Sequence, residues 1–281
     1  MADWTVTDLG EGVHIFGWLA GFYFCPFLVT PDGVLAVDPV DERAAANYRE
    51  AIASVTSAPI RTIVYSHEHK DHIAGAASLA PDAEIVAHTL AGNRIAVRRD
   101  PVILPPTRLT DGDETLALGG RAVELRYFGP NHSDSNLAIL FSTGRGRLLY
   151  YCDVVEPGFA PYRNMPDTDL EGLLRSLEAA DGLGVSLVAG GHGMPGDPAW
   201  IGRTRRYLLD LLEAVEAAYR SGGGQAPLPG EDGVSMTERV RRGVCQRAAD
   251  SVRDRYGNWT GFDLWAPMTA DRLLSYVITG N

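Results

Sequence analysis

Short apolar runs of strand length recur through roughly the first two thirds of the chain. Apolar runs of this length, bounded by Gly, Pro, Asn and Asp, are typical of β-strands buried in a core. The sequence therefore predicts a β-rich region, with a helix at residues 73–79 behind one of its strands. The predicted strands are residues 13–16, 27–30, 34–37, 62–65, 84–87, 136–143, 147–153 and 185–189.

A hairpin is predicted where two of these runs flank the short turn Gly144-Arg145-Gly146. Glycine-containing turns of this kind join antiparallel strands. Folding the chain at this turn brings Asp153 roughly opposite Leu137. We therefore expect Asp153 to share one rim of the sheet with His132, which precedes the hairpin.

The last third of the chain has a different pattern. Residues 204–220 and 236–256 have the apolar spacing of helices, and a glycine run beginning at residue 221 predicts a flexible linker reaching about residue 233. An aromatic-rich stretch follows at residues 259–265. The expected organisation is a main domain at residues 1–220 and a linker with a helical extension at residues 221–281. The extension is expected to serve as a lid or as a homodimer contact.

Composition indicates a compact protein with a sizeable core. The chain has 281 residues, of which 45% are hydrophobic and 22% charged, enough to bury one large domain. No apolar stretch approaches the roughly 18 residues that suggest a membrane span, and residues 1–4 lack the features of a secretory signal. The three cysteines are widely spaced, which suits a reducing compartment. A cytoplasmic location and no membrane partner are therefore expected.

The formal net charge of −11 argues against a nucleic-acid partner, because phosphate contacts dominate nucleic-acid affinity. Arginines cluster near residues 203–206 and 239–242, but both clusters lie on helical stretches that also carry Asp or Glu. Such mixed stretches are typical of solvated helix faces. We therefore expect a small substrate that is neutral or mildly charged.

The most specific chemical feature is residues 67–72, which read His-Glu-His-Lys-Asp-His directly behind a predicted strand. Only seven of the 281 residues are His, so three within six positions argue against chance. Neutral imidazoles and ionised carboxylates are the side chains that bind zinc and similar metals near neutral pH. The alternation of His67 and His69 is that of an extended chain, so a strand, a ligand loop and a helix are expected in that order.

The spaced donors His67, His69, Asp71 and His72 resemble the signature of the metallo-β-lactamase superfamily, whose members are mostly dinuclear metal hydrolases. That resemblance covers about residues 10–200 and implies a four-layer αβ/βα sandwich with, here, a helical C-terminal extension. The family also requires three later donors, each expected at the end of a strand. The chain supplies them as His132, Asp153 and His192.

The resemblance assigns these donors to two metal sites. Two zinc ions per chain are expected, with iron or manganese as substitutes, and a metal-bridging hydroxide as nucleophile. Asp71 is also expected to be catalytic, by stabilising or protonating the leaving group. The first site comprises His67, His69 and His132, the second comprises Asp71, His72 and His192, and Asp153 bridges them.

The implied function is hydrolysis of a small carbonyl substrate, namely an ester, lactone, thioester or lactam. Asp153 stands where several β-lactamases carry Cys or Ser, and Glu156 where lactonase relatives often place Tyr, so neither narrow activity is favoured. Three alternatives remain open. They are a mononuclear iron dioxygenase acting on a persulfide, a sulfatase or phosphodiesterase with Arg163 as an anion clamp, and a metal-free binding module.

Two segments are expected to contact the substrate. Aromatic residues on an early hairpin overhang the metal site in related hydrolases, although packing in the core would explain them equally well. The irregular segment after Asp153 starts near the metals, where loops commonly carry specificity. The candidate contacts are Trp18, Phe22, Tyr23, Tyr162, Arg163 and Asn164.

The sequence also predicts where two residues near the predicted donors lie, namely Asp38 and Cys152. Asp38 resembles the family's Asp that supports the ligand loop without binding metal, and initiation of the Pro39 turn is nearly as good an explanation. Cys152 adjoins Asp153, and strand alternation is expected to turn its side chain to the opposite face.

Overall fold

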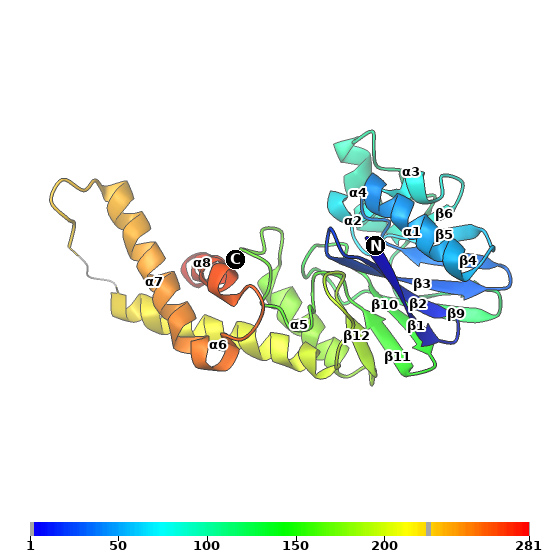
Figure 1. Ribbon diagram of the computed structural model, residues 1–281. Helices are drawn as coiled ribbons and strands as arrows, with labels where there is room; N and C mark the ends of the chain where they lie inside the picture. The colour runs from blue at the N-terminus through cyan, green and yellow to red at the C-terminus, as the bar shows by residue number, and fades with distance from the viewer. Residues whose placement is uncertain (1–2, 223–225, 281) are drawn as a thin grey trace.

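The computed structural model describes residues 3–222 and 226–280 (Figure 1). The strands are β1 (Trp4–Gly10), β2 (Val13–Trp18), β3 (Tyr23–Thr30), β4 (Gly33–Val37), β5 (Ile60–Val64), β6 (Glu84–His88), β7 (Arg108–Thr110), β8 (Glu114–Leu118), β9 (Arg121–Arg126), β10 (Ala138–Thr143), β11 (Gly146–Tyr150) and β12 (Leu187–Ala189). The helices are α1 (Glu42–Val55), α2 (Lys70–Ile73), α3 (Ala76–Leu79), α4 (Thr89–Arg98), α5 (Leu170–Asp181), α6 (Ala199–Gly222), α7 (Gly233–Tyr256) and α8 (Phe262–Thr279).

Two mixed sheets contain these strands. In the first sheet β1 to β7 lie in chain order, antiparallel from β1 to β4 and parallel from β4 to β7. In the second sheet the order is β12, β11, β10, β9 and β8, and β12 is parallel to β11. Parallel neighbours need crossover connections, which α1, α3, α4 and α5 supply. The expected hairpin is confirmed as β10 and β11, paired from Ile139 with Tyr150 to Thr143 with Gly146.

The two sheets pack face to face through one apolar cluster. Ile15, Leu28 and Leu35 contribute to it from the first sheet, and Ile139 and Leu148 from the second. Because alternate strand residues point to opposite faces, the other residues of each strand are free to pack against helices. The helices α1, α3 and α4 cover the first sheet, and α5 with the start of α6 lies against the second (Figure 1). The expected four-layer αβ/βα sandwich is therefore confirmed.

The ligand segment differs from the single helix expected at residues 73–79. It forms two short helices, α2 and α3, with Gly75 between them. A Cβ atom at Gly75 would lie 2.3 Å from the carbonyl oxygen of Pro39 and 2.5 Å from that of Asp41. The interruption therefore lets the segment lie directly against the turn that follows β4.

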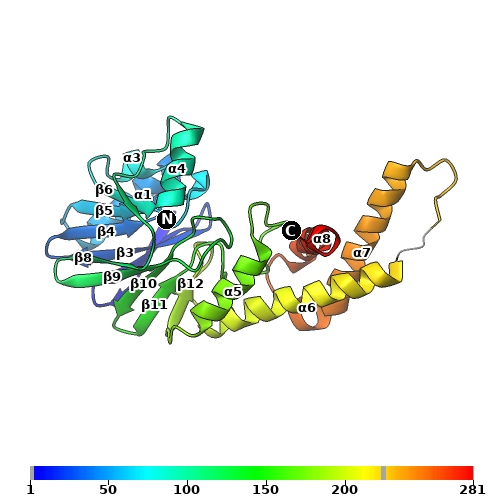
Figure 2. The same ribbon diagram turned by 180° about the vertical axis from the view of Figure 1, so that it is seen from behind.

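The C-terminal helices form an arm that projects from the sandwich (Figures 1 and 2). The helix α6 begins at residue 199, five residues before the expected start, and α7 and α8 pack along it. Leu211 of α6, Val244 of α7 and Leu273 of α8 share one apolar cluster with Leu173 of α5. The arm and the sandwich therefore have a common core. Residues 223–225 of the expected linker lie outside the described residues.

The arm also holds a loop of the sandwich in place. From α8, the hydroxyl of Thr269 donates to the carbonyl oxygen of Arg163 at 3.0 Å, and Arg272 donates to that of Thr168 at 2.9 Å. Both acceptors lie in the loop between β11 and α5. No helix within residues 3–222 and 226–280 is both long and apolar enough to cross a membrane.

One close backbone approach sets the position of the segment that carries His132. A Cβ atom at Gly172 of α5 would lie 1.8 Å from the carbonyl oxygen of Pro130. We predict that Gly172→Ala lowers the free energy of unfolding by about 1–3 kcal/mol, because the backbone must shift to remove the overlap. Denaturant unfolding measures this loss.

Gly202 of α6 is the matched control, since a Cβ atom there would meet only the carboxylate of Asp181, at 3.7 Å. Gly202→Ala is expected to stabilise the protein by up to about 1 kcal/mol through helix propensity. Equal stability of the two variants would contradict the proposed overlap at Gly172.

Candidate metal centre

All seven predicted donors lie at one rim of the sandwich, in segments that follow strands or precede the β10–β11 hairpin. The first segment follows β5 and includes α2, and the second precedes β10. Two more segments follow β11 and β12. Neighbouring strands bring segments distant in sequence to one place, so the fold assembles the donors. They are His67, His69, Asp71, His72, His132, Asp153 and His192.

The carboxylate of Asp153 lies at the middle of this group. Its Oδ2 atom lies 3.5 Å from His67 Nε2, 3.2 Å from His132 Nε2 and 3.2 Å from His72 Nε2. Its Oδ1 atom lies 3.3 Å from His192 Nε2. One carboxylate thus faces imidazoles from both expected sites, as a bridging ligand must.

The donors divide into the two expected sets. Donor atoms of His67, His69, His132 and Asp153 all lie within 4.8 Å of one another. Those of the second set, Asp71, His72 and His192, meet the same limit. A tetrahedral ion with bonds of about 2.0–2.1 Å separates its donors by roughly 3.3 Å. The spacing within each set is therefore compatible with one metal ion.

The buried imidazoles also fit a metal. His67 Nε2 and His72 Nε2 are buried and have no hydrogen-bond partner among the described residues. Leaving buried polar atoms unsatisfied is costly, and a metal bond removes that cost. Burial and the neighbouring imidazole of His72 hold the pKa of His67 well below its usual value. His67 is therefore neutral, which is the form that binds a metal.

The negative charge of Asp153 is stabilised by positive charge in the site. Burial alone would raise the pKa of Asp153, but the imidazoles of His72 and His132 outweigh burial and hold that pKa well below its usual range. The same carboxylate overcomes the effect of burial on His192 and raises the pKa of His192 to about 9. Without another cation the site attracts protons, and bound metal ions would supply the same charge.

The backbone of Asp153 departs from strand geometry. Its φ angle is +61°, and its N–H donates to the carbonyl oxygen of Gly190 at 2.7 Å. The expectation that alternation turns Cys152 away from the metal centre is wrong, because β11 ends at Tyr150. The thiol of Cys152 lies 3.3 Å from Nδ1 of His72, behind the imidazole nitrogen that faces Asp153.

Asp38 lies beneath the ligand loop, as expected. It is fully buried, and its carboxylate accepts the N–H of Ser66 and the hydroxyl of Tyr150, both at 2.8 Å. Its Oδ2 atom lies 3.9 Å from Nδ1 of His72. Asp38 therefore fixes the backbone just before His67 and lies, like Cys152, on the Nδ1 side of the His72 imidazole, whose Nε2 faces Asp153.

Glu68 is a site residue that the sequence reasoning missed. Its side chain is fully buried and points away from the donors. It accepts hydrogen bonds from the hydroxyls of Ser133, at 3.2 Å, and Ser135, and Arg94 lies 3.4 Å away. Glu68 thus ties the first ligand loop to the segment that carries His132. The signal was present in the sequence, because an extended chain turns Glu68 opposite to its two His neighbours.

A second missed residue is Asp167, in the loop between β11 and α5. Its carboxylate lies 2.9 Å from Nε2 of His69, while Nδ1 of His69 lies 3.1 Å from Nε2 of His132. His69 therefore presents Nδ1 to the other donors and uses its second nitrogen for Asp167. Carboxylates commonly orient metal-binding imidazoles in this way. Nothing in the local sequence identifies Asp167, which is 98 residues from His69.

The hairpin of β2 and β3 places its three candidate residues differently. The hydroxyl of Tyr23 donates to Asp71 at 3.0 Å, and its ring lies 4.5 Å from that of His192. Phe22 is 46% exposed and packs edge-on against Phe159 at 5.5 Å. Trp18 is buried and stacks on Tyr23, with ring centres 6.1 Å apart. Tyr23 and Phe22 therefore border the donors, whereas Trp18 supports them from the core.

The three candidates in the loop after β11 are not brought to the donors. Tyr162, Arg163 and Asn164 are exposed. Tyr162 packs against Trp265 of α8 at 5.2 Å, and the guanidinium of Arg163 lies over the Tyr162 ring. Within the described part of the chain, no recorded hydrogen bond, ion pair or ring contact joins these three residues to a metal donor.

Fold and donor set together define an αβ/βα sandwich protein with a candidate metal site between its sheets. Residues 20–192, more than half of the chain, match the family model of the metallo-beta-lactamase superfamily. The chain belongs to this superfamily, and the resemblance read from the sequence is confirmed. Most members of the superfamily are enzymes.

One relative by sequence is the 2,4-dinitroanisole O-demethylase subunit alpha of Nocardioides sp. (strain JS1661), with 34% identity over 193 residues. The match covers 67% of this chain and 54% of the relative, so the chain spans about half of that protein's length.

Solved structures share the fold. A metallo-beta-lactamase from Pontibacter korlensis has a TM-score of 0.63 and 19% identity, over 74% of this chain and 99% of that one. A metallo-beta-lactamase from Hirschia baltica has a TM-score of 0.60 and 20% identity, over 72% of this chain and 96% of that one. At these identities the likeness concerns the fold alone.

We predict that Asp167→Ala weakens metal binding about ten- to a hundredfold, because the imidazole of His69 loses the carboxylate that orients it. Competition for zinc with a chelating dye measures this change. Asp82→Ala is the control, since Asp82 is exposed. Equal zinc affinity of the two variants would show that Asp167 does not position His69.

Proposed function

We propose that this protein is a dinuclear metal hydrolase acting on a small substrate with an electron-poor carbon. The observation that carries the proposal is the place of Asp153, with Oδ2 beside three imidazoles and Oδ1 beside a fourth. A carboxylate so placed is suited to hold two cations at once. Zinc fits the mixed imidazole and carboxylate donors, and iron or manganese would also be accepted.

The donor residues have distinct parts in this proposal. His67, His69 and His132 would hold the first ion through neutral nitrogens, and Asp71, His72 and His192 would hold the second. When bound, the ions lower the pKa of water from about 16 to about 7 and so supply hydroxide at neutral pH. The chain itself then needs only to position the substrate and to stabilise the group that leaves.

Asp71 and Tyr23 are the residues placed to stabilise the leaving group. The Tyr23 hydroxyl donates to the Asp71 carboxylate. Burial, together with the nearby Asp71 carboxylate, raises the pKa of Tyr23 well above its ordinary value. The phenol therefore stays protonated, and its single O–H orients the Asp71 carboxylate beside the metals; a substrate oxygen would receive this hydrogen bond only by displacing Asp71.

The surroundings favour a small apolar substrate. Phe22 and Phe159 pack edge to face beside His192, whose Nδ1 lies 3.1 Å from the carbonyl oxygen of Phe22. Aromatic rings at the rim suit a flat, uncharged molecule. The net charge of −11 disfavours a nucleic acid. Esters, lactones, thioesters and lactams remain the substrate classes of this proposal, and a reducing compartment remains its setting.

A second candidate reaction is hydrolytic demethylation of an electron-poor aryl methyl ether. The 34% identical relative supports it, since its name describes O-demethylation of 2,4-dinitroanisole. Hydroxide would add to the ring carbon that bears the methoxy group, and the bond from that carbon to the methoxy oxygen would break. Methanol and a phenol result, and no electrons are gained or lost. The same donors would serve both reactions.

The other readings have less support. A mononuclear iron dioxygenase would leave one of the two donor sets without a role. A sulfatase or phosphodiesterase with Arg163 as anion clamp is disfavoured, because that guanidinium lies over the exposed Tyr162 ring. A metal-free module would leave two buried imidazole nitrogens unsatisfied.

We predict that zinc-loaded protein holds two metal ions per chain and hydrolyses activated esters or lactones. Asp153→Ala should reduce metal content to one ion or fewer and hydrolysis to the level of chelator-treated protein, because the bridging carboxylate is lost. Elemental analysis and a substrate panel measure both effects. Asp254→Ala is the control, since Asp254 is exposed on the arm. An Asp153→Ala protein with two metals and full activity would refute the proposal.

The aryl ether reaction has its own test. With 2,4-dinitroanisole in water enriched in heavy oxygen, we expect label in the phenol and none in methanol, because hydroxide attacks the ring carbon. Mass spectrometry of both products measures this. Label in methanol would exclude attack on the ring, and absence of both products would remove this candidate while leaving ester hydrolysis open.

A further inference from the structure

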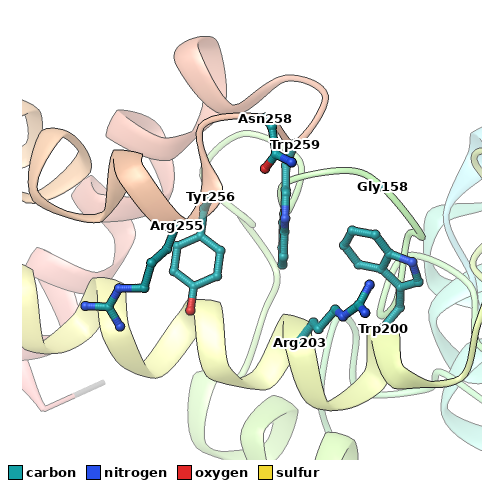
Figure 3. Close-up of a pocket in the computed structure, with 7 residues that line it drawn as sticks. All are labelled: Gly158, Trp200, Arg203, Arg255, Tyr256, Asn258 and Trp259. Carbon is teal, nitrogen blue, oxygen red and sulfur yellow. The ribbon is translucent and has the colours of Figure 1, made fainter.

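A cavity away from the metal donors lies where the turn between α7 and α8 meets the start of α6 (Figure 3). Its volume is about 440 Å³. Pockets for small molecules commonly measure about 300–1,000 Å³ and combine an apolar floor with a few polar groups. The cavity therefore has the size of a ligand site.

The floor of the cavity is aromatic. Trp259 and Tyr256 are buried, and Trp200 is half-buried. The rings of Trp200 and Trp259 lie 4.9 Å apart with their planes at 65°. Indole rings fixed in this way offer rigid aromatic edges and faces that lose little entropy on binding, because packing already holds them.

The rim of the cavity is polar and positively charged. Arg203, Arg255 and Asn258 are exposed at its edge, and Figure 3 shows Arg203 rising from α6 beside Trp200. The guanidinium of Arg203 lies 5.1 Å from the centre of the Trp200 ring. Flat guanidinium groups stacked on aromatic rings keep their edge donors free for a second partner.

Only one of the two rim charges is neutralised by a carboxylate of the arm. Arg255 lies 2.7 Å from the carboxylate of Asp210, which also accepts the hydroxyl of Tyr256 at 2.5 Å. Arg203 forms no ion pair with any carboxylate in the described part of the chain. A chain with a net charge of −11 therefore leaves one unpaired cation over an aromatic floor.

We propose that this cavity is a second ligand site, which binds a small planar aromatic carboxylate with its ring against Trp259 and Trp200 and its carboxylate on Arg203. A guanidinium pairs with a carboxylate through two parallel hydrogen bonds, which suits this group better than a spherical anion. The backbone at Gly158 closes one side without filling it, since a Cβ atom there would meet nothing within 4 Å.

The site is separate from the metal centre. Gly158 lies two residues beyond Glu156, whose carboxylate accepts the backbone N–H of His192 at 3.1 Å. The two sites therefore border the same loop, yet they share no side chain. Ligand binding in the cavity should consequently survive removal of the metals, which distinguishes it from carboxylate binding to a metal ion.

The test is a titration of the full chain with benzoate, in which calorimetry and tryptophan fluorescence measure binding. It is done once with chelator and once without. We expect saturable binding with one site per chain, quenching of indole emission and the same affinity after chelation. Benzamide, which is aromatic but neutral, and acetate, which is anionic but not aromatic, should each bind at least about tenfold more weakly, since each lacks one of the two interactions.

Two variants locate the site. Arg203→Gln should weaken benzoate binding at least about tenfold, because it removes the paired charge. Arg220→Gln is the matched control on the same helix, where Arg220 pairs with Glu216, and should bind as the unaltered protein does. Any one of four results overturns the proposal: no binding at millimolar benzoate, loss of binding with chelator, equal affinity for benzamide, or unchanged affinity of the Arg203→Gln protein.

Discussion

The attraction between the carboxylate of Asp153 and the imidazoles around it is the interaction on which the candidate site depends. Four imidazole nitrogens lie 3.2–3.5 Å from its two oxygens. A largely enclosed carboxylate, with its side chain only 16% exposed, is disfavoured without positive charge nearby. The strand ends of both sheets must therefore bring histidines, and through them cations, to this one residue.

Contacts behind the donors keep the imidazoles in place. Asp38 fixes the backbone before His67, Glu68 joins two ligand segments, and Asp167 contacts the outer nitrogen of His69. Each of these carboxylates accepts hydrogen bonds from a different part of the chain. Asp38 and Glu68 are buried, and burial of such groups costs stability unless they are satisfied, so their presence indicates a site whose geometry must be held closely.

The C-terminal helices are an addition to the sandwich that contacts one loop near the candidate metal site. The helix α8 holds the loop between β11 and α5 through the carbonyl oxygens of Arg163 and Thr168, and Asp167 lies between them. The arm thus supports a residue of the metal site although it shares no donor with it. Folds of this superfamily keep the scaffold and differ in loops and additions, where substrate preference commonly arises.

The sequence by itself predicted eight of the twelve strands of the described residues and the β10–β11 hairpin, because apolar runs and glycine turns are local properties of the chain; it did not predict β1, β7, β8 or β9. The spacing of His67, His69 and Asp71 is also local, and the resemblance that it carries supplied the other candidate donors. Tertiary structure decided the rest. It placed Cys152 behind His72, brought Asp167 to His69 and left Tyr162 against Trp265. These contacts join segments far apart in sequence, so they depend on how helices and loops pack, which no local pattern records.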